Sequence, residues 1–233
     1  MHQKLVVFSG AGMSAESGIN TFRASDGLWE NHRIEDVATP EAFRRDPALV
    51  LEFYNVRRKQ VMAAKPNAAH AMIAELQQDF DVQVITQNID DLHERAGSKK
   101  VLHLHGEIMK ARSSVDENEF YPVPNGEINI GDKCGRGFQL RPHVVWFGEE
   151  VPLIQTARHL AAQAELFLII GTSLIVYPAA GLVNAAKPEI PKYLIDPGTF
   201  DLHQYQNLQH IQQNAVAGME ELLPVLKSHL AAK

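Results

Sequence analysis

VVFSGAGMSAESGINTFR, residues Val6 to Arg23, decides the fold, because an apolar run passes directly into a glycine-rich loop. The run Lys4 to Phe8 is short and β-branched, which is typical of a strand buried in a parallel sheet. Gly10, Gly12 and Ala15 then fit the pattern G-x-G-x-x-G/A, in which the first glycine makes a tight turn and the second lets the backbone approach a pyrophosphate. The stretch therefore predicts a strand that leads into a dinucleotide-binding loop. The candidate binding residues of this loop are Gly10, Ala11, Gly12, Ser14 and Ala15.

Short apolar runs of this kind recur along the chain and alternate with segments of helical pattern. The predicted strands are Lys4 to Phe8, Val82 to Thr86, Val101 to Leu104, Leu166 to Ile170 and Tyr193 to Ile195. The predicted helices are Pro66 to Phe80, Pro152 to Ala164, Pro178 to Lys187 and about Gly218 to Leu230. A proline near the first turn opens the first three of these helices. The alternation predicts an α/β fold with a Rossmann-like parallel sheet and helices on both faces.

Two segments do not follow that alternation. Residues 25–65 are helical in pattern and rich in charge, with Pro40 and Pro47 as helix starts, and residues 107–142 are polar, with glycines and prolines. We expect both to be insertions that form a smaller lobe on one catalytic domain, residues 1–233. The Rossmann-like core would then comprise residues 1–24, 66–106 and 143–233.

Composition narrows the functional classes. The formal net charge of -6 argues against general affinity for nucleic acid, which depends on phosphate neutralisation by Lys and Arg. Cys134 is the only cysteine of the 233 residues, so an internal disulfide framework is excluded and a reducing compartment is expected. We find no apolar run long enough for a signal peptide or a membrane span, and we expect a cytoplasmic protein with no membrane partner. The oligomeric state is left open.

Four blocks make the sequence specific. They are TQNIDDLH at Thr86 to His93, His105-Gly106, LRPHVVWFGE at Leu140 to Glu149, and GTSLIVYPAA from Gly171. In order and spacing they resemble the sirtuin family of NAD-dependent protein lysine deacylases, from about Val6 to the last helix. The resemblance implies NAD as cofactor and an acyl-lysine protein or peptide as substrate. It also implies nicotinamide, free lysine and O-acyl-ADP-ribose as products.

His105 is the candidate catalytic residue. An imidazole titrates near neutral pH and can accept a proton from a ribose hydroxyl. A histidine that merely caps a strand end is the alternative, and the following glycine and the resemblance to sirtuins favour the base. His103, two residues earlier, is expected on the opposite strand face in a structural role.

Gln87, Asn88 and Asp90 follow the carboxyl end of a predicted strand, where doubly wound sheets bind ligands. An Asx turn that opens the next helix is an alternative that could hold at the same time. The resemblance implies that Gln87 contacts a ribose, and that Asn88 and Asp90 shape the nicotinamide pocket.

The resemblance implies further contacts with NAD. Phe22 would shield the reactive ribose carbon and Arg23 would contact phosphate. Gly171, Thr172 and Ser173 follow a strand and would bind NAD, although small polar residues commonly end strands. A ribose would be bound by Asp196, and Ala215 would line the adenine pocket.

A dehydrogenase would carry an acidic residue about 20 positions beyond the glycines, and none is convincingly placed there. This argues against hydride transfer and for chemistry that breaks the bond to nicotinamide. An ADP-ribosyltransferase or NAD glycohydrolase would use the same cofactor blocks, and an NAD-sensing module would not need a general base. Retention of both His105 and the pair Tyr54 and Arg57 favours the deacylase over each of these alternatives.

Tyr54 and Arg57 form Y-x-x-R on a predicted helix, so that both side chains share one face and can converge on a carboxylate. An exposed helix carries such a pair by chance about as often. The pair resembles the signature of sirtuins that remove succinyl or malonyl groups, with acetyl as a further substrate. The resemblance also predicts that residues 144–149 form a strand that binds the substrate backbone, with one of Trp146 and Phe147 in the core. The substrate contacts of that strand would be Val145, Phe147, Gly148 and Glu149.

Most sirtuins carry two C-x-x-C pairs that bind zinc between the HG and LRP blocks. Here that interval offers only Cys134, with Gly131 at the position of its partner and Ser113 and Ser114 near the other pair. We therefore expect no zinc. Side-chain packing is expected to hold the segment instead, through Phe120, Tyr121, Ile128 and Ile130.

Overall fold

A six-stranded parallel sheet forms the centre of the protein. The structure is a computed structural model, and it describes residues 2–20, 28–29, 32–116, 119–123, 126–174 and 176–231. The strand order is β11-β10-β9-β1-β4-β5. In that order the strands are Leu208–Ile211, Lys192–Ile195, Leu166–Ile170, Lys4–Ser9, Asp81–Thr86 and Val101–His103. The five predicted strands are thus confirmed, and β11 was missed.

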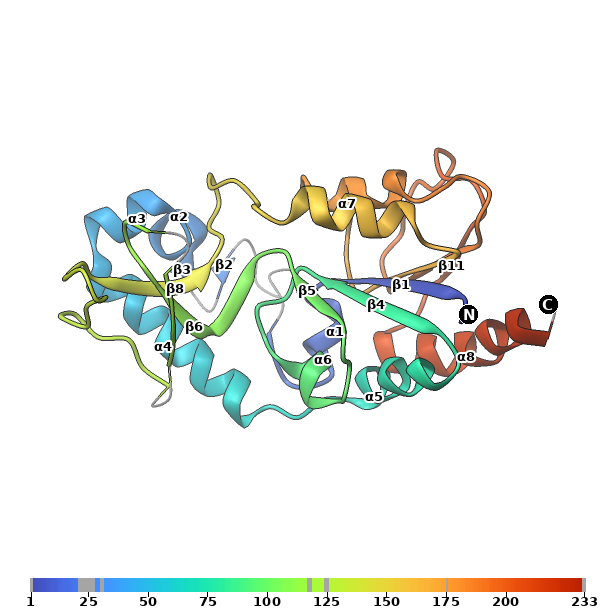
Figure 1. Ribbon diagram of the computed structural model, residues 1–233, viewed down its shortest axis with the longest axis horizontal. Coiled ribbons are helices and arrows are strands. Elements are labelled where there is room, and N and C mark those ends of the chain that lie inside the picture. The colour runs from blue at the N-terminus through green and yellow to red at the C-terminus, as the bar shows by residue number, and fades with distance from the viewer. Residues whose placement is uncertain are drawn as a thin grey trace.

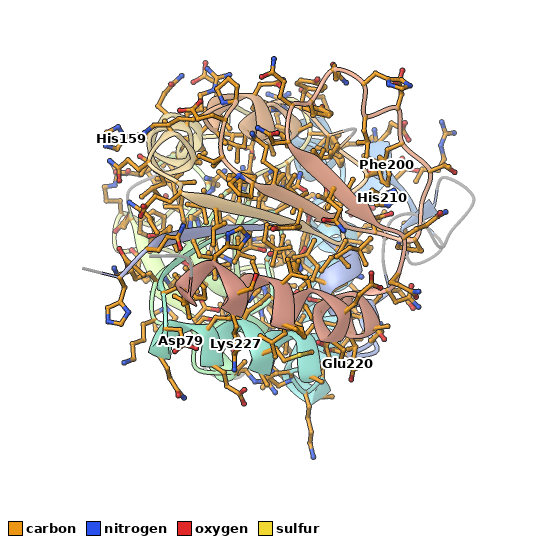
Figure 2. All side chains as sticks on the ribbon, turned by 90° about the vertical axis from the view of Figure 1, so that its right-hand side faces the viewer. Asp79, His159, Phe200, His210, Glu220 and Lys227 are labelled. Carbon is orange, nitrogen blue, oxygen red and sulfur yellow. The ribbon has the colours of Figure 1, made fainter. Side chains whose placement is uncertain are left out.

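Helices cover both faces of this sheet, as the fold prediction required. On one face, α5 (Ala68–Glu75) and α8 (Ala215–Ala231) pack against alternate side chains of the strands. On the other, α7 (Ile154–Ala162) and the 3-10 helix η3 (Ala179–Ala185) do the same. Figure 2 looks along the sheet, with His159 of α7 above it and Lys227 of α8 below. Because both faces are covered, central strands such as β9 are buried along their whole length and read as continuous apolar runs.

The order of the strands creates a topological switch point. From β1 the chain passes to β4 and β5 on one side, and it later returns to β9, β10 and β11 on the other. The loops that follow β1 and β9 therefore lie side by side at the carboxyl edge of the sheet. Doubly wound sheets bind their ligands at such a point.

Two helices differ from their predictions. The segment predicted as an α-helix from Pro178 to Lys187 is the 3-10 helix η3, in which several small residues lie close beneath α7. The helix predicted through Phe80 ends at Glu75 and continues only as a short 3-10 turn, η2 (Leu76–Gln78). No described helix has both the length and the apolarity that a membrane crossing requires.

The two insertions pack together at the end of the molecule away from α8 (Figure 1). The first contains β2 (Leu28–Trp29), β3 (His32–Arg33), α2 (Ile34–Val37), α3 (Pro40–Arg45) and α4 (Pro47–Ala63). Thr39 and Asp46 cap the starts of α3 and α4 by accepting backbone N–H bonds, and prolines follow at both predicted positions. The second forms an antiparallel sheet in the order β7-β6-β8. Its strands are Phe120–Pro122, Gly106–Ser113 and Leu140–Val144.

The expected packing of this antiparallel sheet is half wrong. Ile128 is 2% exposed and packs near Tyr121, but Phe120 and Ile130 are 50% and 59% exposed. Ile128 belongs to a small buried apolar cluster with Leu51, Ala111 and Val123, and polar residues of α4 add buried contacts to it. Both the backbone N–H and the carbonyl of Ile128 bond the side-chain amide of Asn55, and the Nε of Arg58 donates to the Ile108 carbonyl. A sequence pattern that assigns cores to apolar residues could not find this arrangement.

The sulfur of Cys134 accepts a hydrogen bond from the Ser113 hydroxyl at 3.5 Å, at the position where the resemblance places a lost zinc site. Within the described residues, no three His, Cys, Asp or Glu side chains gather in a way that could hold a metal ion.

Candidate active site

A cavity of about 550 Å³ opens at the carboxyl edge of the sheet and extends to α4 and the loop after β8. The predicted site residues that line it are Ala11, Gly12, Ser14, Ala15, Tyr54, Arg57, Gln87, Asn88, Asp90, His105, Val145, Phe147, Gly148, Glu149, Gly171, Thr172, Ser173, Asp196 and Ala215. Gly10 lies behind this lining, and Phe22 and Arg23 fall outside the described residues. Residues predicted from separate blocks of sequence thus share one cavity.

The glycines at the switch point allow two loops to cross. The Gly12 N–H donates to the Gly171 carbonyl at 2.8 Å. A Cβ on Gly12 would lie 2.8 Å from the Gly171 Cα, and one on Gly10 would lie 2.7 Å from the Thr172 Cβ. Gly171 itself has a φ of +64°, and its Cβ would lie 2.2 Å from the backbone nitrogen of Met13. In this structure the glycines are therefore required for loop packing, a role that the dinucleotide pattern did not predict.

His105 lies between β5 and β6, where its side chain lines the cavity. Its Nδ1 is 3.0 Å from the Gln87 carbonyl oxygen, and because a carbonyl only accepts, Nδ1 carries the proton. Nε2 is then the basic nitrogen. Burial lowers the pKa of His105, which keeps the imidazole neutral at neutral pH. The ring is thus prepared to accept a proton.

A chain of hydrogen bonds runs along the back of the cavity. The Asn88 amide donates to the Ser14 hydroxyl at 3.1 Å, and that hydroxyl donates to the Asp90 carboxylate at 3.0 Å. The other carboxylate oxygen of Asp90 accepts the Leu92 N–H at 3.2 Å, which is an Asx turn before α6 (Leu92–Arg95). Burial raises the pKa of Asp90. Asp90 therefore opens a helix through an Asx turn and also lines the cavity, and its part in a nicotinamide pocket stays a prediction.

Two further contacts join neighbouring loops at the sheet edge. The Thr172 hydroxyl donates to the Gln87 side-chain oxygen at 2.9 Å, which links the loops after β9 and β4. Asp196 follows β10, is 3% exposed and accepts the Gly198 N–H at 2.8 Å. Hydroxyl, amide and carboxylate groups thus surround this part of the cavity, and such groups suit the polar hydroxyls of a ribose.

His103 has the structural role that was expected. Its Nδ1 donates to the Asn88 carbonyl, and its Nε2 lies 2.7 Å from the Glu94 carboxylate. Burial alone would lower the pKa of His103, but the hydrogen bond and the charge of Glu94 outweigh burial and raise it. The ring therefore supports the loop of Asn88 from behind the cavity.

Tyr54 and Arg57 lie on one face of α4, as their spacing predicted, and both are buried, at 0% and 5% exposed. They line the end of the cavity that is formed by the first insertion. Burial raises the pKa of the Tyr54 hydroxyl far above its ordinary value, so the phenol stays neutral. The pair combines a neutral phenol with a guanidinium in a largely dry environment.

The prediction of a strand over residues 144–149 is wrong, because β8 ends at Val144. The N–H groups of Val145 and Phe147 donate to the carbonyls of His105 and Ala38, so the chain turns away from the sheet. Trp146 is 3% exposed and Phe147 is 47% exposed, which confirms that one of the two aromatics is in the core. Glu149 accepts hydrogen bonds from two guanidinium groups, and this carboxylate therefore holds the loop in place.

Sequence reasoning left several lining residues out of the site. Trp146 was considered only as a core or strand residue, although it lay in a block that was already singled out. The others include Ile19, Asn20, Val176, Tyr177, Pro197 and Asn214. Tyr177 lies four positions after Ser173 in the block of the GTS motif, and its 72% exposure at the cavity could not be read from the sequence.

Comparison with known proteins agrees with this site. The family model described as Sir2 family matches residues 10–178. An NAD-dependent protein deacylase of Bacteroides thetaiotaomicron is 52% identical over 229 residues, covering 96% of this chain and 98% of its own. An NAD-dependent protein deacylase of Helicobacter pylori is 51% identical over 224 residues, covering 96% of this chain and 97% of its own.

Solved structures give the same result. The complex of a Sir2 homolog with NAD is 38% identical, with a TM-score of 0.87 over 98% of this chain and 91% of that one. A variant Sir2 homologue in complex with ADP ribose is 39% identical, with a TM-score of 0.88 over 100% of this chain and 95% of that one. The order of the sequence blocks, the cavity that unites them and these likenesses together show that the chain belongs to the Sir2 family, the sirtuins.

Proposed function

We propose that this sirtuin is an NAD-dependent protein lysine deacylase that prefers acyl groups ending in a carboxylate, such as succinyl and malonyl. Acetyl would be a second, weaker substrate. One observation carries the proposal: a single cavity contains the basic histidine, the crossed loops of the switch point and the buried Tyr54 and Arg57. The names of the curated relatives support the general activity.

The cavity fits NAD in size and chemistry. Its volume of about 550 Å³ lies within the range of ligand pockets. The crossed loops at Gly12 and Gly171 would lie along the pyrophosphate, and the groups of Gln87, Thr172 and Asp196 suit ribose hydroxyls. The chain of Asn88, Ser14 and Asp90 would bind the nicotinamide end. When bound, NAD supplies a ribose carbon that is activated towards attack by the acyl oxygen.

His105 would then act as general base. With Nδ1 fixed on the Gln87 carbonyl, Nε2 can take the proton from a ribose hydroxyl and so allow that oxygen to receive the acyl group. The lowered pKa keeps Nε2 unprotonated at neutral pH. In the net reaction, acyl-lysine, NAD and one water molecule would give free lysine, nicotinamide and O-acyl-ADP-ribose.

The acyl preference would come from Tyr54 and Arg57. A carboxylate between them would accept a charged hydrogen bond from the guanidinium and a second bond from the phenol. Hydrogen bonds to charged groups contribute about 1.5 to 3 kcal/mol, which is roughly ten- to a hundredfold in discrimination. An acetyl group, which lacks the carboxylate, gains neither.

The test is NAD-dependent deacylation of matched succinyl-lysine and acetyl-lysine peptides, followed by mass spectrometry together with nicotinamide release. We expect succinyl to be removed well above acetyl, and Arg57→Met to reduce desuccinylation far more than deacetylation. Lys59→Met, which removes an exposed charge from the same helix, is the matched control.

Each alternative outcome has a distinct meaning. Equal loss of both activities in Arg57→Met would refute the acyl preference and keep the deacylase. Nicotinamide release without deacylation would move the assignment to ADP-ribosyl transfer or NAD hydrolysis.

A further inference from the structure

The hydroxyl of Tyr54 is held by a second aromatic residue. The Trp146 indole Nε1 donates to the Tyr54 oxygen at 3.0 Å, and the two rings lie 6.4 Å apart between centroids. An indole N–H can only donate, so this bond fixes the phenol oxygen as its acceptor. Both side chains are almost fully buried. The indole therefore determines where the phenol oxygen lies.

The indole is itself held on its ring face. The guanidinium carbon of Arg141 lies 3.3 Å from the ring centroid, a cation–π contact away from bulk water. Arg141 also donates to the Val144 carbonyl at 2.9 Å, at the point where β8 ends. Phe43 of α3 packs against the same indole at 5.3 Å between centroids. The ring is thus fixed by charge and by packing.

A buried ion cluster fixes Arg141 in turn. Glu149 accepts bonds from both terminal nitrogens of Arg141 at 2.6 and 3.0 Å, and from Arg112 at 3.2 Å. The same carboxylate accepts the backbone N–H of Trp146 at 2.7 Å. Because two guanidinium groups share one carboxylate, the cluster retains positive charge beside the acyl end of the cavity.

We propose that Trp146 is a positioning residue for acyl selection, held by Arg141 and Glu149, and that it acts by orienting the Tyr54 hydroxyl towards the acyl group. This inference rests on the proposed function only for the identity of that acyl group. It assigns part of the specificity to the loop of residues 145–149, beyond the pair on α4. It also gives a role to the Glu149 carboxylate, which lines the cavity and is hydrogen-bonded by Arg112 and Arg141.

The test compares the ratio of kcat/KM for succinyl-lysine to acetyl-lysine peptides in Trp146→Phe, Tyr54→Phe and the double variant. Trp146→Phe keeps an aromatic ring and removes the N–H. We expect Tyr54→Phe, which loses a hydrogen bond to the acyl carboxylate, to lower the ratio by about tenfold or more, and Trp146→Phe, which loses one neutral bond, to lower it by about three- to tenfold. If the indole acts through the phenol, the double variant will fall no further than Tyr54→Phe alone.

Controls separate positioning from folding. Phe43→Leu loosens the packing of the same indole and keeps its N–H, so the ratio should stay within about twofold of wild type. The KM for NAD should be unchanged in Trp146→Phe, and its Tm, although lowered by the smaller ring, should stay well above the assay temperature. If that variant does not fold, Arg141→Lys, which keeps the charge and loses the planar stack, should lower the ratio instead.

Two results would overturn the inference. The first is full multiplication of the Trp146 and Tyr54 effects in the double variant, and the second is an equal loss with both peptides. A wild-type enzyme without succinyl preference would refute the proposed acyl class alone. In that case the same cycle is repeated with the acyl-lysine peptide whose kcat/KM falls most in Tyr54→Phe. A double variant that falls no further than Tyr54→Phe supports the positioning role, and full multiplication of the two effects refutes it.

Discussion

At the scale of single residues, the tautomer of His105 is set by one backbone carbonyl. The Gln87 backbone carbonyl accepts a hydrogen bond from the Nδ1–H of His105, and the side-chain oxygen of Gln87 accepts one from the Thr172 hydroxyl. One residue of the loop after β4 therefore orients the base and links two loops of the candidate NAD site. A change that moved this loop would alter proton acceptance and cofactor contact together.

The pH dependence of kcat/KM for the acyl peptide at saturating NAD tests the state of His105. In the proposed role of general base the neutral imidazole is the active form, so activity should rise with pH and then level off. Because burial lowers the pKa of His105, the acid limb should have its midpoint below the ordinary value of 6.5. His105→Asn should remove the activity and retain NAD binding. A midpoint above 6.5 would contradict the assignment.

Gly171→Ala tests the crossing of the two loops. A Cβ there would lie 2.2 Å from the Met13 nitrogen, in a backbone conformation that L-residues rarely adopt. We expect the KM for NAD to rise by more than about tenfold, or the Tm to fall by several degrees. Gly135→Ala is the control, because its Cβ would meet only the ends of two side chains, Glu119 at 3.5 Å and Tyr121 at 3.8 Å, both at ordinary contact distance. Unchanged NAD binding and Tm in Gly171→Ala would show that the loops can separate without loss.

At the scale of elements, α4 is buried on two sides. Tyr54 and Arg57 face the cavity, whereas Asn55 and Arg58 face the antiparallel sheet. Arg58 is fully buried among backbone carbonyls of Ile108 and Gly126, and burial lowers its pKa to about 10. The helix thus joins the acyl end of the cavity to the segment that would hold zinc in most sirtuins.

Asn55→Ala should destabilise this junction. The substitution leaves the Ile128 N–H and carbonyl without their side-chain partner in a buried place, which costs about 2 to 4 kcal/mol. Urea unfolding would measure the loss. Lys59→Ala on the same helix removes an exposed ion pair with Glu127 and should change stability little. Equal effects of the two substitutions would refute the role of Asn55.

Some elements could be predicted from the sequence and others could not, for physical reasons. Strands such as β9 are buried on both faces and give uniform apolar runs. β11 is an edge strand of alternating exposure, and its pattern LQHI is too short to stand out. Val145 to Phe147 read as a strand because they are apolar, but they face the cavity and the core of the first insertion, outside any sheet. Sequence spacing likewise does not show which arginines approach Glu149. Its carboxylate, for which the resemblance implied a substrate contact, is bonded by Arg112 and Arg141.

At the scale of the whole molecule, the second insertion should be stable without a metal. It is held by its contacts with α4 and by the hydrogen bond between Ser113 and Cys134. We expect metal analysis of the purified protein to find far less than one zinc per chain, and a strong chelator to leave Tm and activity unchanged. One zinc per chain, or a fall in Tm with chelator, would contradict this.

Acid stability is the property in which the buried histidines act together. His70 and His93 lie between α5 and α6 with ring centroids 4.9 Å apart, and both are almost fully buried. Burial lowers the pKa of His70 to about 4 and that of His93 well below 6.5. The unfolded chain therefore binds more protons than the folded one as pH falls from about 6.5 to 4, and stability must fall over that window, by on the order of 3 kcal/mol from His70 alone. The effect of His103 on stability runs in the opposite direction, because its raised pKa adds stability that is present at low pH and lost as pH rises through that value.

The expected result is a Tm that drops between pH 6.5 and 4. The slope of Tm against pH should be shallower in His93→Gln. It should be unchanged in His159→Gln, a substitution on the exposed side of α7 (Figure 2). A His93→Gln slope equal to that of wild type would show that carboxylates, and not this pair, control acid unfolding.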